Sequence, residues 1–573
     1  MTRSSVPDTQ ALPQEQPLSH TTLLLSGLQH LAIIAPIGLV FPLLVLRAAD
    51  AGAVLQEAMI TASLLALGIG SIVLCLRRRA LGSGFLCPAV FTAAYLPASL
   101  AAAQNGGLAL VFGMTMFAGA CEIAFSFLLR RLRAYLPVEI AGLAVVMIGL
   151  ILGLIGFRLL LGLDSHGEFQ AGDLEPGALE VGLFALALVV GLNVWGKGRL
   201  RIFSVLICVA LAYPLAWGLG QVDLSDFQAA QPQHLLALPH LPLLLPAFDW
   251  TLAIPFAAGA LACALRATGD ITTCQKIAEA DWVRPEMGSI ERGVRADGLG
   301  TLLAGALGTV GMNTFSSSIG LSQATGIIQR RVGFAIGGLF IALAFSPFVV
   351  MLTIGMPEPL TGAILIFSSA FILANGLSII VARLLDARRI LTIGIAIVFG
   401  ISHDVFPPFY DHVPLWLKSI TGSALVVALV TALALNALFR IGVRQSASLD
   451  RPLNKELLPA LVDFCREKGA LWGARRDVME RVISGLTEAV ELALGRGVSD
   501  SPVRVHLHYD EFRILATVSF EDAPEQAPVH SEEETEEAPD TSELEFRLMR
   551  HFAEKVALSH QQGYTRLKLL FDS

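Results

Sequence analysis

An arginine and an aspartate lie four residues apart inside an otherwise apolar stretch of this chain. Arg266 and Asp270 belong to the run 264–279, ALRATGDITTCQKIAE. A spacing of four places both side chains on one face of a helix. Charged residues inside membrane-length apolar segments are candidates for a transport pathway, because their burial is costly. We predict that both line a solute site; a purely structural ion pair is the alternative.

A polar break, NTFSSS at residues 313–318, interrupts the next apolar region. Interrupted helices of this kind occur at the substrate sites of transporters. Ser317 and Ser318 offer hydroxyl groups beside a half-helix expected to begin near Ile319, and the N-terminus of a helix attracts anions. Serines in membrane helices also bond to their own backbone, and this alternative stays open.

Two titratable residues, His30 and Asp270, are candidates for binding a coupling ion, H+ or Na+. Of the two readings of His30, proton carrier or packed side chain, we favour packing. Glu122 and Glu139 also lie in or near apolar segments and receive no role. The seven cysteines show no CxxC or metal-ligand spacing, so we predict neither a metal site nor a cofactor. No GxxxxGK[ST] motif occurs, and we predict a protein that is not an enzyme.

Composition identifies the class of protein that must position these residues. The 573 residues are 54% hydrophobic and 15% charged, with a mean hydropathy of +0.65. A soluble protein carries about a quarter charged residues. The apolar residues come in runs of roughly 17–25, long enough to cross a bilayer, which argues against one large soluble core.

The apolar runs divide into fourteen candidate spans and predict an all-α polytopic membrane protein. The first seven are 22–46, 52–76, 84–103, 107–129, 137–158, 178–195 and 200–218; the second seven are 250–272, 297–311, 314–329, 332–354, 359–382, 389–405 and 416–440. The tenth is the least regular in hydropathy.

Basic residues gather at every second loop between these spans. The groups are Arg77–Arg79; Arg130, Arg131 and Arg133; Lys197, Arg199 and Arg201; Lys276, Arg292 and Arg295; Arg330 and Arg331; Arg383, Arg388 and Arg389; and Arg440 and Arg444. Because positively charged loops stay in the cytoplasm, both termini are predicted to be cytoplasmic. The membrane is predicted to be the inner membrane of a bacterial cell. Residues 1–20 are polar and are predicted to form a disordered cytoplasmic tail.

The spans also show internal symmetry. Residues 137–142 (PVEIAG) open span five, and residues 357–362 (PEPLTG) open span twelve. Both read Pro-x4-Gly, and a separation of seven spans inverts the orientation in the membrane, as in two inverted repeats. Spans three (residues 87–92, CPAVFT) and ten are also seven apart, and both are interrupted. Broken segments must line a protected cavity; a simple kink at Pro88 and at the serines is the alternative.

Three motifs resemble those of one transporter family. They are GLQHL at 27–31, ADGLG at 296–300 followed by LAG at 303–305, and NTFSSSIG at 313–320 with Thr325. The chain is similar there to the nucleobase–cation symporter-2 family, or nucleobase–ascorbate transporters, which includes xanthine and uracil permeases. The resemblance covers about residues 20–440. It implies a core domain (spans 1–4 and 8–11), a gate domain (spans 5–7 and 12–14), an elevator-like motion and often a homodimer.

The chain departs from the family at the residues that read the base. Arg266 stands where the family usually has a glutamate, and Ser317 and Ser318 stand where it has Glu or Gln followed by Asn. In span three Tyr95 takes the place of the aromatic residue that commonly backs the substrate. The candidate substrate-binding residues are Phe91, Tyr95, Arg266, Asp270, Thr314, Phe315, Ser317 and Ser318. Arginine is permanently charged, and its guanidinium donates hydrogen bonds but accepts none. The site should therefore favour a negatively charged or acceptor-rich solute, such as a urate-like purine anion or a small carboxylate or oxyanion.

A smaller domain follows the membrane part. Residues 441–452 read as a polar linker, and 453–573 as a cytoplasmic α+β domain with a helix at 478–494, strands at 503–508, 513–518 and 567–571, and a helix at 543–557. Residues 522–542 are acidic and are predicted to be disordered. The order of these helices and strands faintly resembles the histidine-kinase-like ATPase domains of anti-sigma kinases. However, no magnesium-binding Asn follows Glu488, and no glycine-rich lid occurs. We predict a degenerate regulatory or dimerising domain.

These observations favour a secondary transporter of nucleobases such as xanthine, urate or uracil, with the lipid bilayer as surroundings and no nucleic acid as partner. Two alternatives stay open. One is a small-anion carrier of the related sulfate-permease type, and the other is a membrane sensor that signals through its C-terminal domain.

Overall fold

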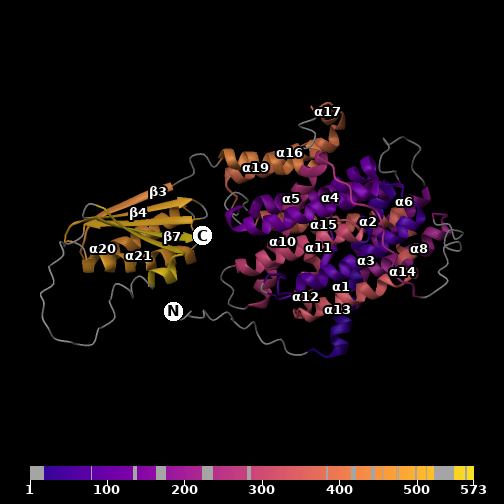
Figure 1. The fold of residues 1–573 in the computed structure, drawn as a ribbon, viewed down its shortest axis with the longest axis horizontal. Helices are drawn as coiled ribbons and strands as arrows, with labels where there is room; N and C mark the ends of the chain where they lie inside the picture. Colours follow the sequence, from indigo (N-terminus) through magenta and orange to yellow (C-terminus); the bar gives the residue numbers. More distant parts are fainter. Residues whose placement is uncertain are drawn as a thin grey trace. The chain divides into compact units, whose positions relative to one another are not determined.

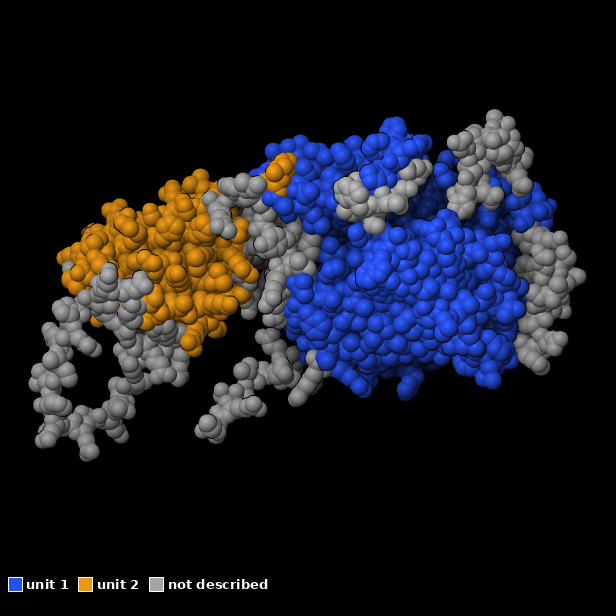
Figure 2. Space-filling view, turned by 45° about the horizontal axis from the view of Figure 1, so that its top comes forward, with its two compact units in different colours: residues 1–437 blue, residues 438–573 orange. Residues whose placement is uncertain are grey.

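The computed structural model describes residues 18–78, 80–132, 138–162, 176–221, 236–279, 285–381, 385–414, 421–439, 445–454, 456–472, 474, 476–496, 498, 500–510, 513–521, 548–561 and 564–572. Figure 1 labels the helices and strands along the chain. The chain divides into two compact units, residues 1–437 (the membrane unit) and residues 438–573 (the C-terminal unit), which Figure 2 colours separately. Residues 1–17 of the predicted tail 1–20 and the acidic segment 522–542 lie outside the described residues, whereas His20 begins α1.

The membrane unit is helical apart from two strands of three residues. Its elements are α1 (His20–Gly38), α2 (Val40–Ala48), α3 (Ala53–Cys75), β1 (Ala89–Phe91), α4 (Leu96–Leu132), α5 (Val138–Leu160), α6 (Pro176–Val194), α7 (Arg199–Ile202), α8 (Ser204–Gly218), η1 (Trp250–Leu252), α10 (Ala253–Ala278), α11 (Met287–Leu307), β2 (Met312–Thr314), α12 (Ser316–Thr325), α13 (Arg331–Ala344), α14 (Pro347–Ile354), α15 (Glu358–Val381), α16 (Ala387–Val405), α17 (Pro407–Asp411) and α19 (Ala424–Phe439).

Both predicted interruptions are present, and each is a short strand followed by a helix. β1 and β2 pair antiparallel, with Val90 opposite Asn313. The Ser71 hydroxyl accepts from the Ala89 amide at 3.1 Å, and the Thr301 hydroxyl donates to the Met312 carbonyl at 2.9 Å. Because backbone groups at membrane depth must be paired within the protein, this mutual pairing is what permits two helices to break at the same level.

The count of fourteen spans is supported only in part. Seven helices among the described residues are long and apolar enough to cross a membrane, or eight if α13 and α14, which meet at an 85° bend, form one span. The other predicted spans coincide with shorter, interrupted or more polar helices. α12 has ten residues and is therefore about 15 Å long, half a hydrocarbon core. α11 begins at Met287, ten residues before the predicted start at 297, because its charged first half lowers the local hydropathy.

Two segments that we predicted as repeat equivalents lie against each other. α5 and α15 pack closely, with glycines at both ends of the contact. A Cβ on Gly156 would lie 3.0 Å from the Gly362 carbonyl oxygen, and a Cβ on Gly376 would lie 3.0 Å from the Gly142 carbonyl oxygen. The early residues of one helix thus meet the late residues of the other, so the pair is antiparallel, as inverted repeats require.

The C-terminal unit is a five-stranded antiparallel sheet in the order β3-β4-β5-β7-β6, with α20 and α21 on one face (Figure 1). Its elements are β3 (Gln445–Pro452), α20 (Leu457–Trp472), α21 (Arg476–Arg496), β4 (Pro502–Asp510), β5 (Arg513–Glu521), β6 (Lys555–Gln561) and β7 (Tyr564–Asp572). Alternate residues of β4, β5 and β7 are buried under the helices and form a separate apolar core. Burial raises the pKa of the Cys465 thiol to about 12, so this cysteine stays protonated and unreactive at neutral pH.

Two predictions for this unit are wrong, and one helix was missed. Residues 445–452, read as linker, form β3 and pair with β4; the strand has few apolar residues, and its partner lies about fifty residues further on. The end of the predicted helix 543–557 is strand β6, which pairs with β7. The helix α20 was not predicted. Local residue preferences missed these elements because pairing and packing partners decide them.

Candidate functional site

Asp270 is held by hydroxyl groups from the second interruption. Thr314 Oγ1 donates to Asp270 Oδ2, and Ser316 Oγ donates to Asp270 Oδ1, each at 2.7 Å. Asp270 is 6% exposed and Thr314 is fully buried. The carboxylate of α10 is thus fastened to the point where β2 ends and α12 begins, so a displacement of either element must disturb the other.

Arg266 is the permanent cation of the site. Its Nε lies 3.9 Å from Asp270 Oδ2, one helical turn away, and the residue is 9% exposed. Nε is buried and has no hydrogen-bond partner in the described part of the chain. Because a guanidinium has five donors and this distance exceeds a hydrogen bond, Arg266 keeps unused donor capacity beside an anchored carboxylate.

His30 and Ser318 form a second polar contact, in which Nδ1 of His30 and Oγ of Ser318 are hydrogen-bonded. Both side chains are buried. The Ser318 carbonyl also accepts from the Ser322 hydroxyl at 3.0 Å. His30 therefore joins α1 to the first turn of α12, so it is neither an isolated packing residue nor exposed to bulk water.

The neighbouring serine is placed differently. Ser317 is exposed, whereas Ser318 is fully buried. Phe315 is buried and precedes α12, and its amide donates to the Pro88 carbonyl at 3.1 Å. The two consecutive hydroxyls that were predicted to act together thus face different surroundings, one accessible and one bonded to His30.

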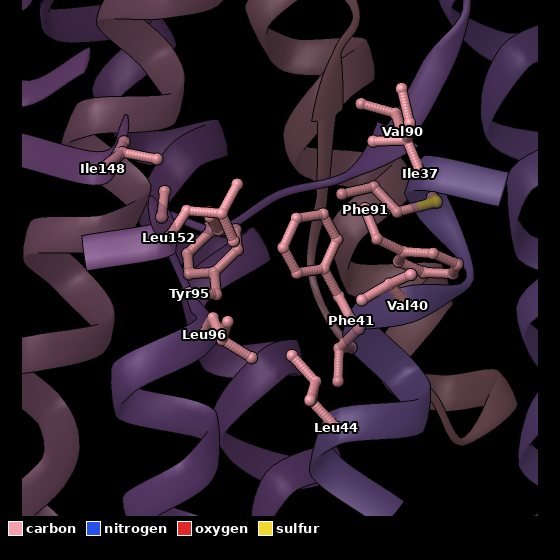
Figure 3. Close-up of a cluster of buried hydrophobic side chains, with 14 of the residues drawn as sticks. Ile37, Val40, Phe41, Leu44, Val90, Phe91, Tyr95, Leu96, Ile148 and Leu152 are labelled. Carbon is pink, nitrogen blue, oxygen red and sulfur yellow. The ribbon is translucent and has the colours of Figure 1, made fainter. Parts of the chain in front are cut away.

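The aromatic candidates of span three lie in an apolar cluster. Phe91 and Tyr95 are each 1% exposed. Figure 3 shows them among Ile37, Val40, Phe41, Leu44, Leu96, Ile148 and Leu152. The Tyr95 ring stacks on Phe256 with 6.4 Å between ring centroids. In this conformation both rings contact other side chains instead of facing an open cavity.

A small cavity of about 20 Å3 lies near the site, lined by Phe85, Leu86, Cys274, Ile277, Ala278, Ile319, Ser322 and Ile328. It has room for about one water molecule and is far below the several hundred Å3 of a typical ligand pocket. A solute of purine size therefore does not fit this cavity without a rearrangement.

Two residues that complete the site were not singled out. Ser316 holds Asp270, and Asn313 accepts from the Thr314 amide at 2.6 Å and donates to the Cys263 carbonyl at 3.2 Å. The run 313–318 was read as a break without strand character. Extended backbone places residues i and i+2 on one side, and this alternation would have grouped Thr314 with Ser316.

Gly311→Ala is expected to destabilise the fold. A Cβ at Gly311 would lie 2.2 Å from Tyr95 Cδ2, and the buried ring is also confined by Gly259, whose added Cβ would lie 2.7 Å from Tyr95 Cδ1. Overpacking of this kind costs about 1–3 kcal/mol, measurable as a lower thermal midpoint in detergent. The matched control is Gly338→Ala, where the added Cβ meets open space; equal midpoints for both variants would contradict this packing.

The chain is similar to known permeases. The Xan_ur_permease profile, described as "Permease family", matches residues 21–408. Xanthine permease XanP of Escherichia coli (strain K12) is 29% identical over 446 residues, which covers 75% of this chain and 94% of that protein. Putative purine permease CPE0397 of Clostridium perfringens (strain 13 / Type A) is 26% identical, covering 73% of this chain and 90% of that protein.

Among solved structures, the murine Slc26a9 anion transporter in its inward-facing state is similar in fold, with a TM-score of 0.51 and 13% identity, covering 79% of this chain and 76% of that one. The family match extends over more than half of the chain and includes α1, α10 and the β2–α12 segment. The chain is therefore a multi-pass membrane protein that belongs to the Xan_ur_permease family of permeases.

Proposed function

We propose that the protein is a secondary active transporter that carries nucleobases such as xanthine, urate or uracil across the bacterial inner membrane. The observation that carries the proposal is the similarity over three quarters of the chain to proteins named as a xanthine permease and a putative purine permease. The arrangement of two paired interruptions beside buried polar residues supports it. The small-anion alternative has only a likeness of fold in its favour.

Within this function, Arg266 directs the site toward anionic or acceptor-rich bases. Its donors are not used up by Asp270, and α12 begins beside it, with exposed Ser317 in the first turn. A urate-like anion offers negative charge and ring acceptors to both. Phe91 and Tyr95 belong to the opposite interruption and would contact the ring only after a rearrangement that frees them from their apolar neighbours.

The packing of the helices supports an elevator mechanism. α11 packs on α3, α4 and α10, and α13 packs on α3, whereas α5 packs with α15 and α6. Where the groups meet, Figure 3 shows Tyr95 and Leu96 close to Ile148 and Leu152, an apolar contact that can slide without breaking hydrogen bonds. An ion pair at 3.3 Å also joins Arg47 on α2 to Glu358 on α15. We propose fourteen spans, cytoplasmic termini, a core that moves against a gate, and assembly as a homodimer.

The test is uptake into liposomes that contain the purified protein. Radiolabelled xanthine, urate and uracil are offered, with sulfate and bicarbonate as rival solutes and protein-free liposomes as the control. We expect uptake of at least one base, and competition by unlabelled bases. Uptake of an oxyanion without any base would favour the small-anion carrier and overturn the proposal.

The C-terminal unit is proposed to regulate transport or to assist dimerisation without catalysing a reaction. A chain ending before Gln445 removes β3 and everything after it, and is expected to retain transport of the base, because the site lies in the membrane unit. The measurement is uptake by the truncated and full chains at equal protein. Complete loss of uptake with an unchanged thermal midpoint would instead favour the sensor alternative.

A further inference from the structure

A pair of buried carboxyl groups lies outside the hydroxyl network that holds Asp270. Glu122 on α4 is 0% exposed, and Asp297 on α11 is 1% exposed. The two residues stand where α4 and α11 touch, because a Cβ on Gly298 would lie 2.8 Å from the amide nitrogen of Ile123, the residue after Glu122. Tyr95 Oη donates to Glu122 Oε2 at 3.4 Å. No donor from the described residues reaches Glu122 Oε1 or either oxygen of Asp297.

Facing carboxylates without a donor between them are unstable in apolar surroundings. Two like charges between touching helices repel, and burial removes the water that would screen them. One proton changes the repulsion into a short, charge-assisted hydrogen bond in which one carboxyl donates to the other. With one proton, the two carboxyl groups can form a hydrogen bond with each other. Without that proton, neither group has a donor to offer the other.

The helix packing keeps water away from this pair. A Cβ on Gly298 would lie 2.9 Å from the Gly119 carbonyl oxygen, and a Cβ on Gly119 would lie 2.4 Å from the Leu302 amide nitrogen. The backbones of α4 and α11 therefore touch beside the carboxyls. Such close approach through small residues is typical of helices packed within a membrane.

The other ionisable groups around the pair come from α10. Asp297 interacts electrostatically with Arg266 and Asp270, and Glu122 interacts electrostatically with the thiol of Cys263. α3 also packs on α11, and its charged residue, Glu57, is exposed in its first turns. The charges of α10 therefore connect the pair electrostatically to the substrate site, and α3 adds no buried charge beside it.

We propose that Glu122 and Asp297 together bind the proton that is co-transported with the substrate. The proposal deepens the transport function given above and rests on it. With its proton, the pair carries one negative charge less, and the field around Arg266 becomes more favourable to an anion. By reciprocity, a bound anion increases the affinity of the pair for its proton. A coupling on the order of tenfold is typical, so proton and anionic base would move as a unit.

The first experiment separates exchange from accumulation in liposomes. Glu122→Gln and Asp297→Asn resemble the protonated pair and cannot release its proton, so exchange of radiolabelled urate or xanthine against internal unlabelled base should stay within about twofold of the unaltered protein. An inward proton gradient of one pH unit supports up to about tenfold accumulation per proton. This accumulation should be lost in both variants and kept in the control Glu57→Gln.

Accumulation by both variants at the level of the unaltered protein would overturn the proposal and leave His30 and Asp270 as candidates. Loss of exchange together with accumulation at an unchanged thermal midpoint would also overturn it, because the pair would then serve substrate binding. Failure of the unaltered protein to exchange any base would refute the transport function alone.

A second measurement needs no substrate. A folded pair that holds one proton binds more protons near neutral pH than the unfolded carboxyls do, so stability must decrease as pH rises. We expect the thermal midpoint of the purified protein to decrease as pH rises above the ordinary carboxyl pKa of about 4, and this decrease to be absent in Glu122→Gln but present in Glu57→Gln. Identical pH dependence in all three would overturn the shared proton, whatever the solute.

Discussion

Arg266→Glu is expected to abolish transport of anionic bases, with a loss of about a hundredfold or more. Hydrogen bonds to charged groups contribute about 1.5–3 kcal/mol, and every 1.4 kcal/mol corresponds to a factor of ten. The substitution removes the donors and places a second carboxylate one turn from Asp270, so an anion meets repulsion. The measurement is initial uptake of radiolabelled urate into liposomes across several concentrations.

The sign of the effect distinguishes charge from shape. Arg266→Gln retains a donor without charge and should lose less transport than Arg266→Glu. Arg266→Lys retains the charge without the planar fork and should lose less than Arg266→Gln. A carboxylate at this position accepts hydrogen bonds, so we also expect Arg266→Glu to gain uptake of a neutral base such as uracil relative to urate. If all three variants carry urate normally, the guanidinium does not bind the solute.

Asp270→Asn is expected to lower both stability and transport. Removing one partner of a buried ion pair leaves an uncompensated charge, at a cost of about 3–5 kcal/mol. The substitution also removes a charged acceptor from the Thr314 and Ser316 hydroxyls that join α10 to α12. We expect a lower thermal midpoint and at least tenfold slower base exchange, measured on the same preparation.

Matched variants separate the contributions. Thr314→Val and Ser316→Ala each remove one hydroxyl and should cost about 1.5–3 kcal/mol, the range for a hydrogen bond to a charged group. When Asp270 is already Asn, the same changes should cost less, because the shared partner has lost its charge. Additive effects would show that the two hydroxyls act independently of Asp270. An Asp270→Asn protein with unaltered midpoint and exchange would remove the residue from the site.

Some strands of the C-terminal unit can be predicted from sequence, and others cannot. Strands β4, β5 and β7 alternate apolar and polar residues, and the sequence predicted all three with shorter bounds. β3 and β6 offer weaker alternation, and they are strands because β4 and β7 supply hydrogen-bond partners. An edge strand is stabilised by hydrogen bonds to its neighbouring strand. The residues of β3 and β6 alone do not reveal that partner.

The candidate site divides in the same way. Family motifs and intramembrane charge made Arg266, Asp270, His30, Ser317 and Ser318 candidates for the site. Which hydroxyl holds which carboxylate oxygen depended on the pairing of β1 with β2, more than two hundred residues apart. Glu122 received no role because its partner Asp297 lies on another helix.

By itself, the sequence determined the class of protein, the two interruptions and the chemical types of the site residues, because hydropathy, charge and glycine or proline breaks act over a few neighbouring residues. Only the tertiary structure decided that Asp270 is anchored by Thr314 and Ser316, and that two carboxyls meet between α4 and α11. Those contacts join distant segments, and their energies depend on distance and burial, which arise only when the helices pack.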